Sequence, residues 1–229
     1  MATSGTYIFN PDLAEIVDDA YERCRIDPAL LTVRHILAAR RSMRFMLSDW
    51  ATDEFDDFRI QRLSFALVDG TATYSGASFF PSHVLDVVTA FLRRDGIDTP
   101  VDLISRRDYD DIPDKSVDGR VDRIFLDKQR DGLVCTTWPV PDSIASTLYF
   151  EAVLKFQDHD TAADTADVPY HLYDAFCAGL AARLAEKFAP PELEEKMYVK
   201  AAMALRKGRN ATREMREVRF SPNTRRNRR

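Results

Sequence analysis

The chain has 229 residues, of which 45% are hydrophobic and 30% are charged, and its net charge is −5. This length allows one large domain or two small ones, and the composition is that of an ordinary globular protein. No stretch approaches the roughly 20 consecutive apolar residues of a membrane-spanning helix, and the acidic N-terminal stretch lacks the basic-then-apolar pattern of a signal peptide. We therefore expect no contact with a membrane.

The three cysteines, Cys24, Cys135 and Cys177, are far apart and form no CxxC pair. Such spacing in a chain without a secretory signal predicts three reduced, buried thiols. We expect the protein to be synthesised in the cytoplasm.

Basic residues gather at the end of the chain. From Lys200 onward there are 11 basic and 2 acidic residues, a net charge of +9. Because the whole chain has a net charge of −5, residues 1–199 have a net charge of −14. An acidic body followed by a basic terminal arm is typical of a protein with an interaction tail.

Two helices are predicted near the start of the chain. Asn10 can cap the first, Pro11 suits its first helical position, and Asp27-Pro28 ends it. Its apolar side is formed by Leu13, Ile16, Val17, Ala20 and Cys24. The second helix is predicted over 32–50, and its apolar side is formed by Val33, Ile36, Met43, Met46, Leu47 and Trp50.

The outer side of this second helix carries Arg34, Arg40, Arg41 and Arg44. One interpretation is a solvated helix surface. The other is a contact surface for an acidic neighbour. Helical periodicity alone does not decide between them.

The period then changes from helix to strand. Alternating apolar residues predict strands at 59–67, 71–74, 84–92, 101–104, 121–128, 133–138 and 146–157. Asp69-Gly70 and residues 129–132 read as hairpin turns. Because these strands are close together in the sequence, we expect a small antiparallel sheet.

Helices are predicted again after residue 167. The first carries an apolar row four residues apart, Leu172, Phe176, Leu180, Leu184 and Phe188, beside small residues that allow close approach of a second helix. Pro190-Pro191 separates it from a last helix with Glu192, Glu194 and Glu195 in its first turn. The core side of that helix is Leu193, Met197, Ala201 and Leu205.

The predicted fold class is therefore α+β: N- and C-terminal helices packed as a helical bundle, with an inserted small antiparallel β-sheet and an extended C-terminal arm. The corresponding ranges are 1–58 for the N-terminal helices, 59–157 for the β region, 158–212 for the C-terminal helices and 213–229 for the arm.

Patterns for catalysis and cofactors are lacking. His35, His83, His159 and His171 form neither HxxxH nor HExxH, and GxSxG, GxxxxGK[ST] and GxGxxG do not occur. The acidic loop 158–167 lacks the Gly and Glu of an EF-hand, although a weak cation site stays open there. Asp53, Glu54, Asp56 and Asp57 could serve as an acid–base pair, but clusters of this kind are common among 37 acidic residues. We predict no enzyme, no cofactor and no metal.

The arm is the remaining candidate site. Its residues that could dock on a protein or contact DNA are Arg213, Arg216, Arg219, Phe220, Arg225, Arg226, Arg228 and Arg229. Several of these arginines could neutralise phosphates, but Phe220 alone can stack on a base, so specific reading of a nucleic acid is not expected. A nucleic-acid-binding module using the arm is kept as the alternative function.

Several segments, taken in order, resemble the head-to-tail adaptor proteins of short-tailed bacteriophages, also called tail accessory or packaged-DNA stabilisation proteins. They are TYIFNPDLAEIVDDAYERC at 6–24, LLTVRHILAARRSMRFMLSDWA at 30–51, TTWPVPD at 136–142 and DVPYHLYDAFCAGLAARLAEKF at 167–188. The resemblance covers nearly the whole chain. It departs from the family pattern at 53–58, where an acidic run replaces a Gly/Asn-rich turn.

The resemblance implies a structural role in the virion, at the head–tail junction. Family members form a ring, typically of twelve copies, that attaches below the portal protein and extends the channel for packaged DNA. The ring also presents a platform for the tail nozzle or tail fibre protein. The resemblance implies that the C-terminal arm reaches toward the portal, and it supplies no catalytic residues.

Overall fold

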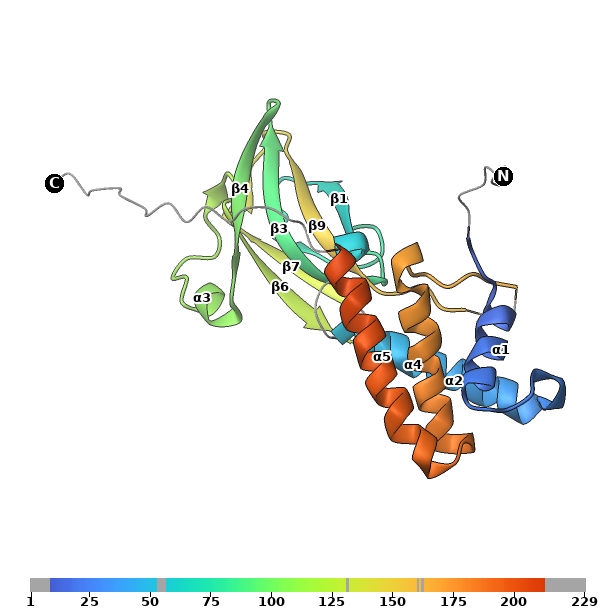
Figure 1. Cartoon of the computed structure of the whole chain (residues 1–229). Helices are drawn as coiled ribbons and strands as arrows, with labels where there is room; N and C mark the ends of the chain where they lie inside the picture. Colours follow the sequence, from blue (N-terminus) through green and yellow to red (C-terminus); the bar gives the residue numbers. More distant parts are fainter. Residues whose placement is uncertain (1–8, 53–56, 131, 160, 162, 213–229) are drawn as a thin grey trace, which may run out of the picture.

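The computed structural model describes residues 9–52, 57–130, 132–159, 161 and 163–212. A layer of helices lies at one end of a strongly curled β-sheet (Figure 1). Each part has its own cluster of buried apolar side chains. After the last strand, Phe156 joins the core of the helical layer, so the chain passes directly from one core to the other.

The first helix, α1, spans Leu13–Arg23. Asp12 is its N-cap and accepts a hydrogen bond from the Glu15 amide at 2.9 Å. Asn10, expected as the cap, instead accepts a hydrogen bond from the Tyr173 hydroxyl through its side chain. A short 3₁₀ helix, η1 (Pro28–Leu30), leads into α2 (Val33–Thr52).

The central helix of the helical layer is α4 (Tyr173–Phe188), which follows the turn η3 (Tyr170–Leu172). The helices α1, α2 and α5 (Pro191–Thr212) all pack on it. Ten residues of α4 are buried because it has neighbours on several sides. A Cβ atom at Gly179 would lie 2.7 Å from Met46 Sδ, so the glycine permits the close approach of α2.

Seven strands form the main sheet, in the order β1-β9-β3-β4-β6-β7-β2. Their bounds are β1 Ile60–Ala66, β2 Thr73–Tyr74, β3 Val84–Arg94, β4 Ile97–Ile104, β6 Arg123–Gln129, β7 Gly132–Trp138 and β9 Thr147–Leu154. The pairing is antiparallel except between β4 and β6, which are parallel. The connection between these two strands contains α3 (Arg106–Asp110) and β5 (Asp118–Gly119), and β5 pairs with β8 (Val140–Pro141). The turn η2 (Asp57–Arg59) precedes β1.

The sheet curls into a half-barrel around its own apolar core. All seven strands contribute buried side chains to one cluster. Phe65 on β1 and Tyr74 on β2 belong to opposite edges of the sheet, yet they are in ring contact. Two register shifts in the pairing of β3 with β9 mark irregularities of the kind that bend strands.

The predicted fold class, a helical bundle with a small inserted antiparallel sheet, is therefore wrong. The sheet is large, mixed and curled, and the helices form a layer at its end. The physical reason is that strands distant in sequence pair directly, as Ile60 does with Val153, and periodicity reveals neither pairing partners nor curvature. The division into four residue ranges stays a prediction.

Two further expectations concern the described residues. None of the helices in these ranges combines the length and apolarity required to cross a bilayer. All three cysteines are buried free thiols, as predicted.

Candidate protein-interaction surface

The outward side of α2 is both apolar and basic. Met43, Met46 and Trp50 face inward, and Met46 and Trp50 lie against Gly179 of α4. On the opposite side, Val33 is 74% exposed, Leu37 53% and Phe45 66%. We call the exposed residues Val33, Arg34, Leu37, Arg41 and Phe45 of α2, together with Leu30 of η1, the α2 surface. Large apolar side chains exposed together on one helix mark an interaction site.

Two residues expected to face inward are exposed instead. Val33 and Ile36 lie in the first turn of α2, whose buried positions begin only at Ala38. In this first turn His35, and not Val33 or Ile36, contacts the helical layer, through the rings of Tyr21 and Phe188. Apolar residues occur around most of the circumference of α2, more than one buried side requires, and this pattern could have indicated an exposed apolar surface.

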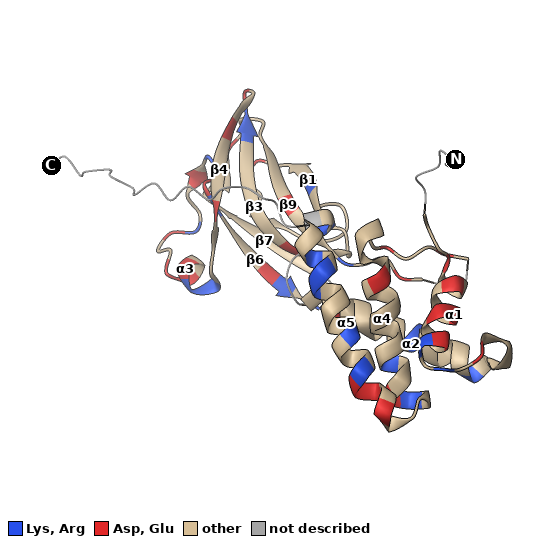
Figure 2. Cartoon of the chain, in the orientation of Figure 1, with Lys and Arg blue, Asp and Glu red and all other residues tan. Residues whose placement is uncertain are grey.

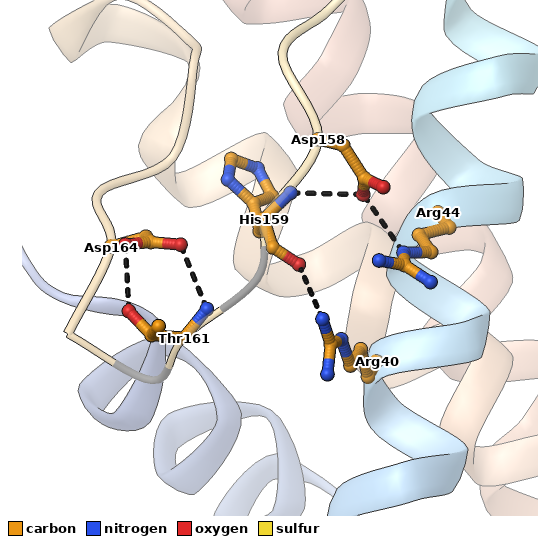
Figure 3. Close-up of polar contacts among 6 residues, drawn as sticks. All are labelled: Arg40, Arg44, Asp158, His159, Thr161 and Asp164. Atoms are coloured by element: carbon orange, nitrogen blue, oxygen red, sulfur yellow. Dashed lines mark hydrogen bonds and ion pairs between the residues drawn. The ribbon is translucent and has the colours of Figure 1, made fainter.

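The predicted row of four arginines divides into two pairs with different environments. Arg40 Nη2 donates to the His159 carbonyl at 3.2 Å, and Arg44 Nε donates to Asp158 Oδ1 at 2.8 Å (Figure 3). These two side chains fasten the segment after β9 to α2. Arg34 and Arg41 are exposed, and neither forms a hydrogen bond or ion pair within the described part of the chain. Arg34 and Arg41 are therefore available for a partner.

A pocket of about 340 Å³ lies beside the α2 surface, between α1, η1, α2 and the residues His159 and Thr161. Its apolar lining includes Leu13, Val17, Leu31, Ile36 and Met43. His159 also lines it, and Nε2 of this ring has no hydrogen-bond partner among the described residues. Burial lowers the pKa of His159, which keeps the imidazole neutral. The pocket can accept an apolar side chain, and in the described part of the chain no hydrogen bond joins the carboxylate and the imidazole of its lining, Asp18 and His159.

A second apolar surface lies on the outward side of α5. Glu195, Val199 and Met203 recur every four residues and are exposed, with Val199 at 48% and Met203 at 66%. The opposite side of the helix buries Leu193 and Met197 in the core of the helical layer. We call the row Pro191, Glu195, Val199 and Met203 the α5 surface. Figure 2 shows acidic residues at the first turn of α5 and basic residues along its later turns.

The acidic loop does not assemble a cation site in the described residues. Asp164 accepts from the amide and hydroxyl of Thr161 (Figure 3), Asp158 pairs with Arg44, and Asp167 accepts from the Gln157 amide. Asp164 and Asp167 therefore hold the loop itself, and Asp158 holds it to α2. Within the described ranges, no three metal-binding side chains come together.

The histidines and thiols are likewise dispersed. His35 accepts from the Thr32 amide at 3.1 Å and packs on the rings of Tyr21 and Phe188. Burial raises the pKa of the Cys24 thiol to about 11 and those of Cys135 and Cys177 to about 12, so none is an activated nucleophile.

The remaining predicted residues fall largely outside the described ranges. This applies to Asp53, Glu54 and Asp56 and to the whole predicted arm, Arg213, Arg216, Arg219, Phe220, Arg225, Arg226, Arg228 and Arg229. Asp57 begins η2. The proposed roles of these residues stay predictions.

Comparison with known proteins adds one match. The family model described as SU10 adaptor protein matches residues 11–228 of the chain. The matched region runs from before α1 to beyond α5, so the similarity includes the helical layer and the curled sheet together. The curated proteins contain no match.

Proposed function

The chain belongs to the SU10 adaptor protein family, whose members have a structural role in phage, and we propose that it forms the head-to-tail adaptor ring of a short-tailed virus. In this proposal the ring attaches below the portal protein after the genome has been packaged. The observation that carries the proposal is the family match over residues 11–228.

The ring extends the channel through which packaged DNA passes. Its number of copies would be twelve, as is typical of the head-to-tail adaptor proteins that the sequence resembles. The charge distribution supports this role, because residues 1–199 carry a net charge of −14. A negative body repels DNA and so discourages sticking in the channel. The basic arm after residue 212 then docks on the portal, where carboxylates can pair with its arginines.

The helical layer supports contacts between neighbouring copies, since both the α2 surface and the α5 surface present apolar side chains to solvent. The curled sheet is the part that faces the tail nozzle, the tail fibre protein or ring neighbours. We assign no reaction to the protein, in keeping with the structural role of its family. Its place is the virion, after synthesis in the host cytoplasm.

Electron microscopy of purified portal rings, alone and mixed with the full chain, tests the proposal. We expect an additional ring-shaped layer on one side of the portal in the mixture only. A control with the chain unfolded in advance excludes nonspecific coating. If saturating protein adds no layer to the portal, the proposal is rejected.

A further inference from the structure

We propose that the α2 surface of one copy binds the α5 surface of the next copy, with the two helices antiparallel and Arg41 opposite Glu195. This inference rests on the proposed function, because it assigns the two faces through which copies of the ring contact each other. It names a pair of surfaces that neither the family match nor the sequence patterns identify.

The spacing of the exposed side chains supports this pairing. The α2 surface places Val33, Leu37, Arg41 and Phe45 four residues apart, and the α5 surface places Pro191, Glu195, Val199 and Met203 four residues apart. Residues with this spacing form the ridges through which helices pack.

Antiparallel alignment brings unlike charges and like apolar groups together. When Arg41 lies opposite Glu195, Leu37 meets Val199, Val33 meets Met203 and Phe45 meets Pro191. Four-residue steps are about 6 Å along each helix, so the register holds over three turns. The side chains of Lys196 and Lys200 also lie exposed on α5. On a helix these positions are turned by roughly 100° from Glu195 and Val199, so they flank the contact.

The two surfaces of one copy cannot reach each other. Both helices pack their inner sides on α4, α2 through Met46 at Gly179 and α5 through Leu193 and Met197. Figure 1 shows α5 running alongside α4, while α2 passes behind α4. The outward sides therefore point away from the subunit in different directions. A contact between unlike faces of successive copies generates a ring when the rotation from copy to copy closes.

Pairing of the α2 surface with itself is disfavoured. Two copies of this helix face would bring four guanidinium groups, those of Arg34 and Arg41 from each copy, into one interface. Like charges opposed across an interface weaken association, whereas Glu195 offers the opposite charge. By the same argument, an acidic helix of another protein, such as the portal, could bind the α2 surface. The experiment must distinguish this occupant from the α5 surface of a second copy.

Cysteine crosslinking tests the contact. The full chain carrying both Leu37→Cys and Val199→Cys is treated with a short bis-maleimide at the concentration at which copies assemble. We expect a ladder of covalent multimers. Each single variant gives no ladder, and the wild-type chain shows the background of its three buried thiols. Ile144→Cys, which is half exposed on the loop before β9, is the surface control.

Charge reversal provides a second measurement on the same assembly. We expect Arg41→Glu to weaken association about tenfold, and Glu195→Arg combined with it to restore most of the loss. Arg130→Glu, an exposed arginine beside the turn between β6 and β7, is the matched control and leaves association unchanged.

The outcomes separate this inference from the proposed function. A portal-bound layer without crosslinking between positions 37 and 199 overturns the contact and leaves the adaptor function standing. Crosslinking without any layer on the portal supports the contact and contradicts the adaptor function. Crosslinking of position 37 to itself, or to the portal in place of position 199, overturns the proposed pairing.

Discussion

The ring centroids of Phe65 and Tyr74 lie 5.0 Å apart, although the two residues belong to opposite edge strands of a seven-stranded sheet. The Tyr74 hydroxyl also accepts a hydrogen bond from the Val68 amide at 2.9 Å, just after β1 ends. A flat sheet would separate its edges by the width of seven strands. This contact therefore closes the half-barrel through side chains, and Phe65 packs on Phe79, Phe80 and Phe150 as well.

Replacing Phe65 with alanine tests the importance of this aromatic contact. We expect the free energy of unfolding to fall by about 3–5 kcal/mol, because the change leaves a cavity among four other rings. Phe91, which stacks on Tyr149 outside the sheet core, is the matched control. Phe91→Ala should cost about 1–2 kcal/mol, since the side chain is only half-buried. Equal losses in urea unfolding would contradict a special role for the closure of the sheet.

His159 predicts a pH dependence of stability. Burial lowers its pKa, so the folded chain holds a neutral imidazole and the unfolded chain binds the proton more readily. The stability contributed by the neutral form is present above the unfolded pKa of about 6.5 and is lost as the pH falls below it. We expect the free energy of unfolding to decline between pH 7 and 5.

The decline should be smaller in His159→Asn, measured by urea unfolding at pH 5, 6 and 7. His83→Asn, which removes an exposed histidine, is measured alongside as the control. An identical slope in the wild type and in His159→Asn would show that other groups cause the pH dependence.

The three cysteines predict low thiol reactivity in the folded protein. Burial raises the pKa of Cys24 to about 11 and those of Cys135 and Cys177 to about 12. The reactive thiolate is therefore scarce at pH 8. We expect a disulfide reagent to modify the native chain slowly and all three thiols rapidly in guanidinium chloride. Rapid reaction of any cysteine in the native state would argue against its burial.

A stop codon after Ala211 tests the predicted role of the arm. We expect docking on the portal to be lost while circular dichroism is unchanged and Tm moves by less than about 2 °C, because every described element but the last residue of α5 is retained. If the nucleic-acid alternative holds, the full chain binds DNA with a steep salt dependence that the truncation abolishes. Undiminished portal docking by the truncated chain would assign that role to another surface.

Much of the secondary structure followed from local patterns. The apolar rows of α2, α4 and α5 repeat at helical spacing, and residues 148–156 alternate as a strand does, so these elements were expected at their positions. Burial of the three thiols also followed from composition and spacing. The family was suggested by four segments in order and is confirmed by the match over residues 11–228.

For α2, local patterns predicted the helix but not which of its side chains are exposed or paired. Val33 and Ile36 satisfy the inward pattern, yet they are exposed, because α1 and α4 contact the first turn of α2 through His35 instead. Arg40 and Arg44 read as a free basic face, yet they hold Asp158 and the His159 carbonyl, more than a hundred residues away in the chain. Neither outcome is encoded in the residues of the helix alone.

The sequence by itself determined the local elements, the apolar and charged composition of their faces and the family. These depend on interactions within a few residues and on motifs that remain readable in one dimension. Only the tertiary structure decided that Ile60 pairs with Val153, that Phe65 meets Tyr74 and that the α2 and α5 surfaces remain uncovered. Pairing and exposure depend on which distant segments pack together, and that choice is made by the burial of the whole chain.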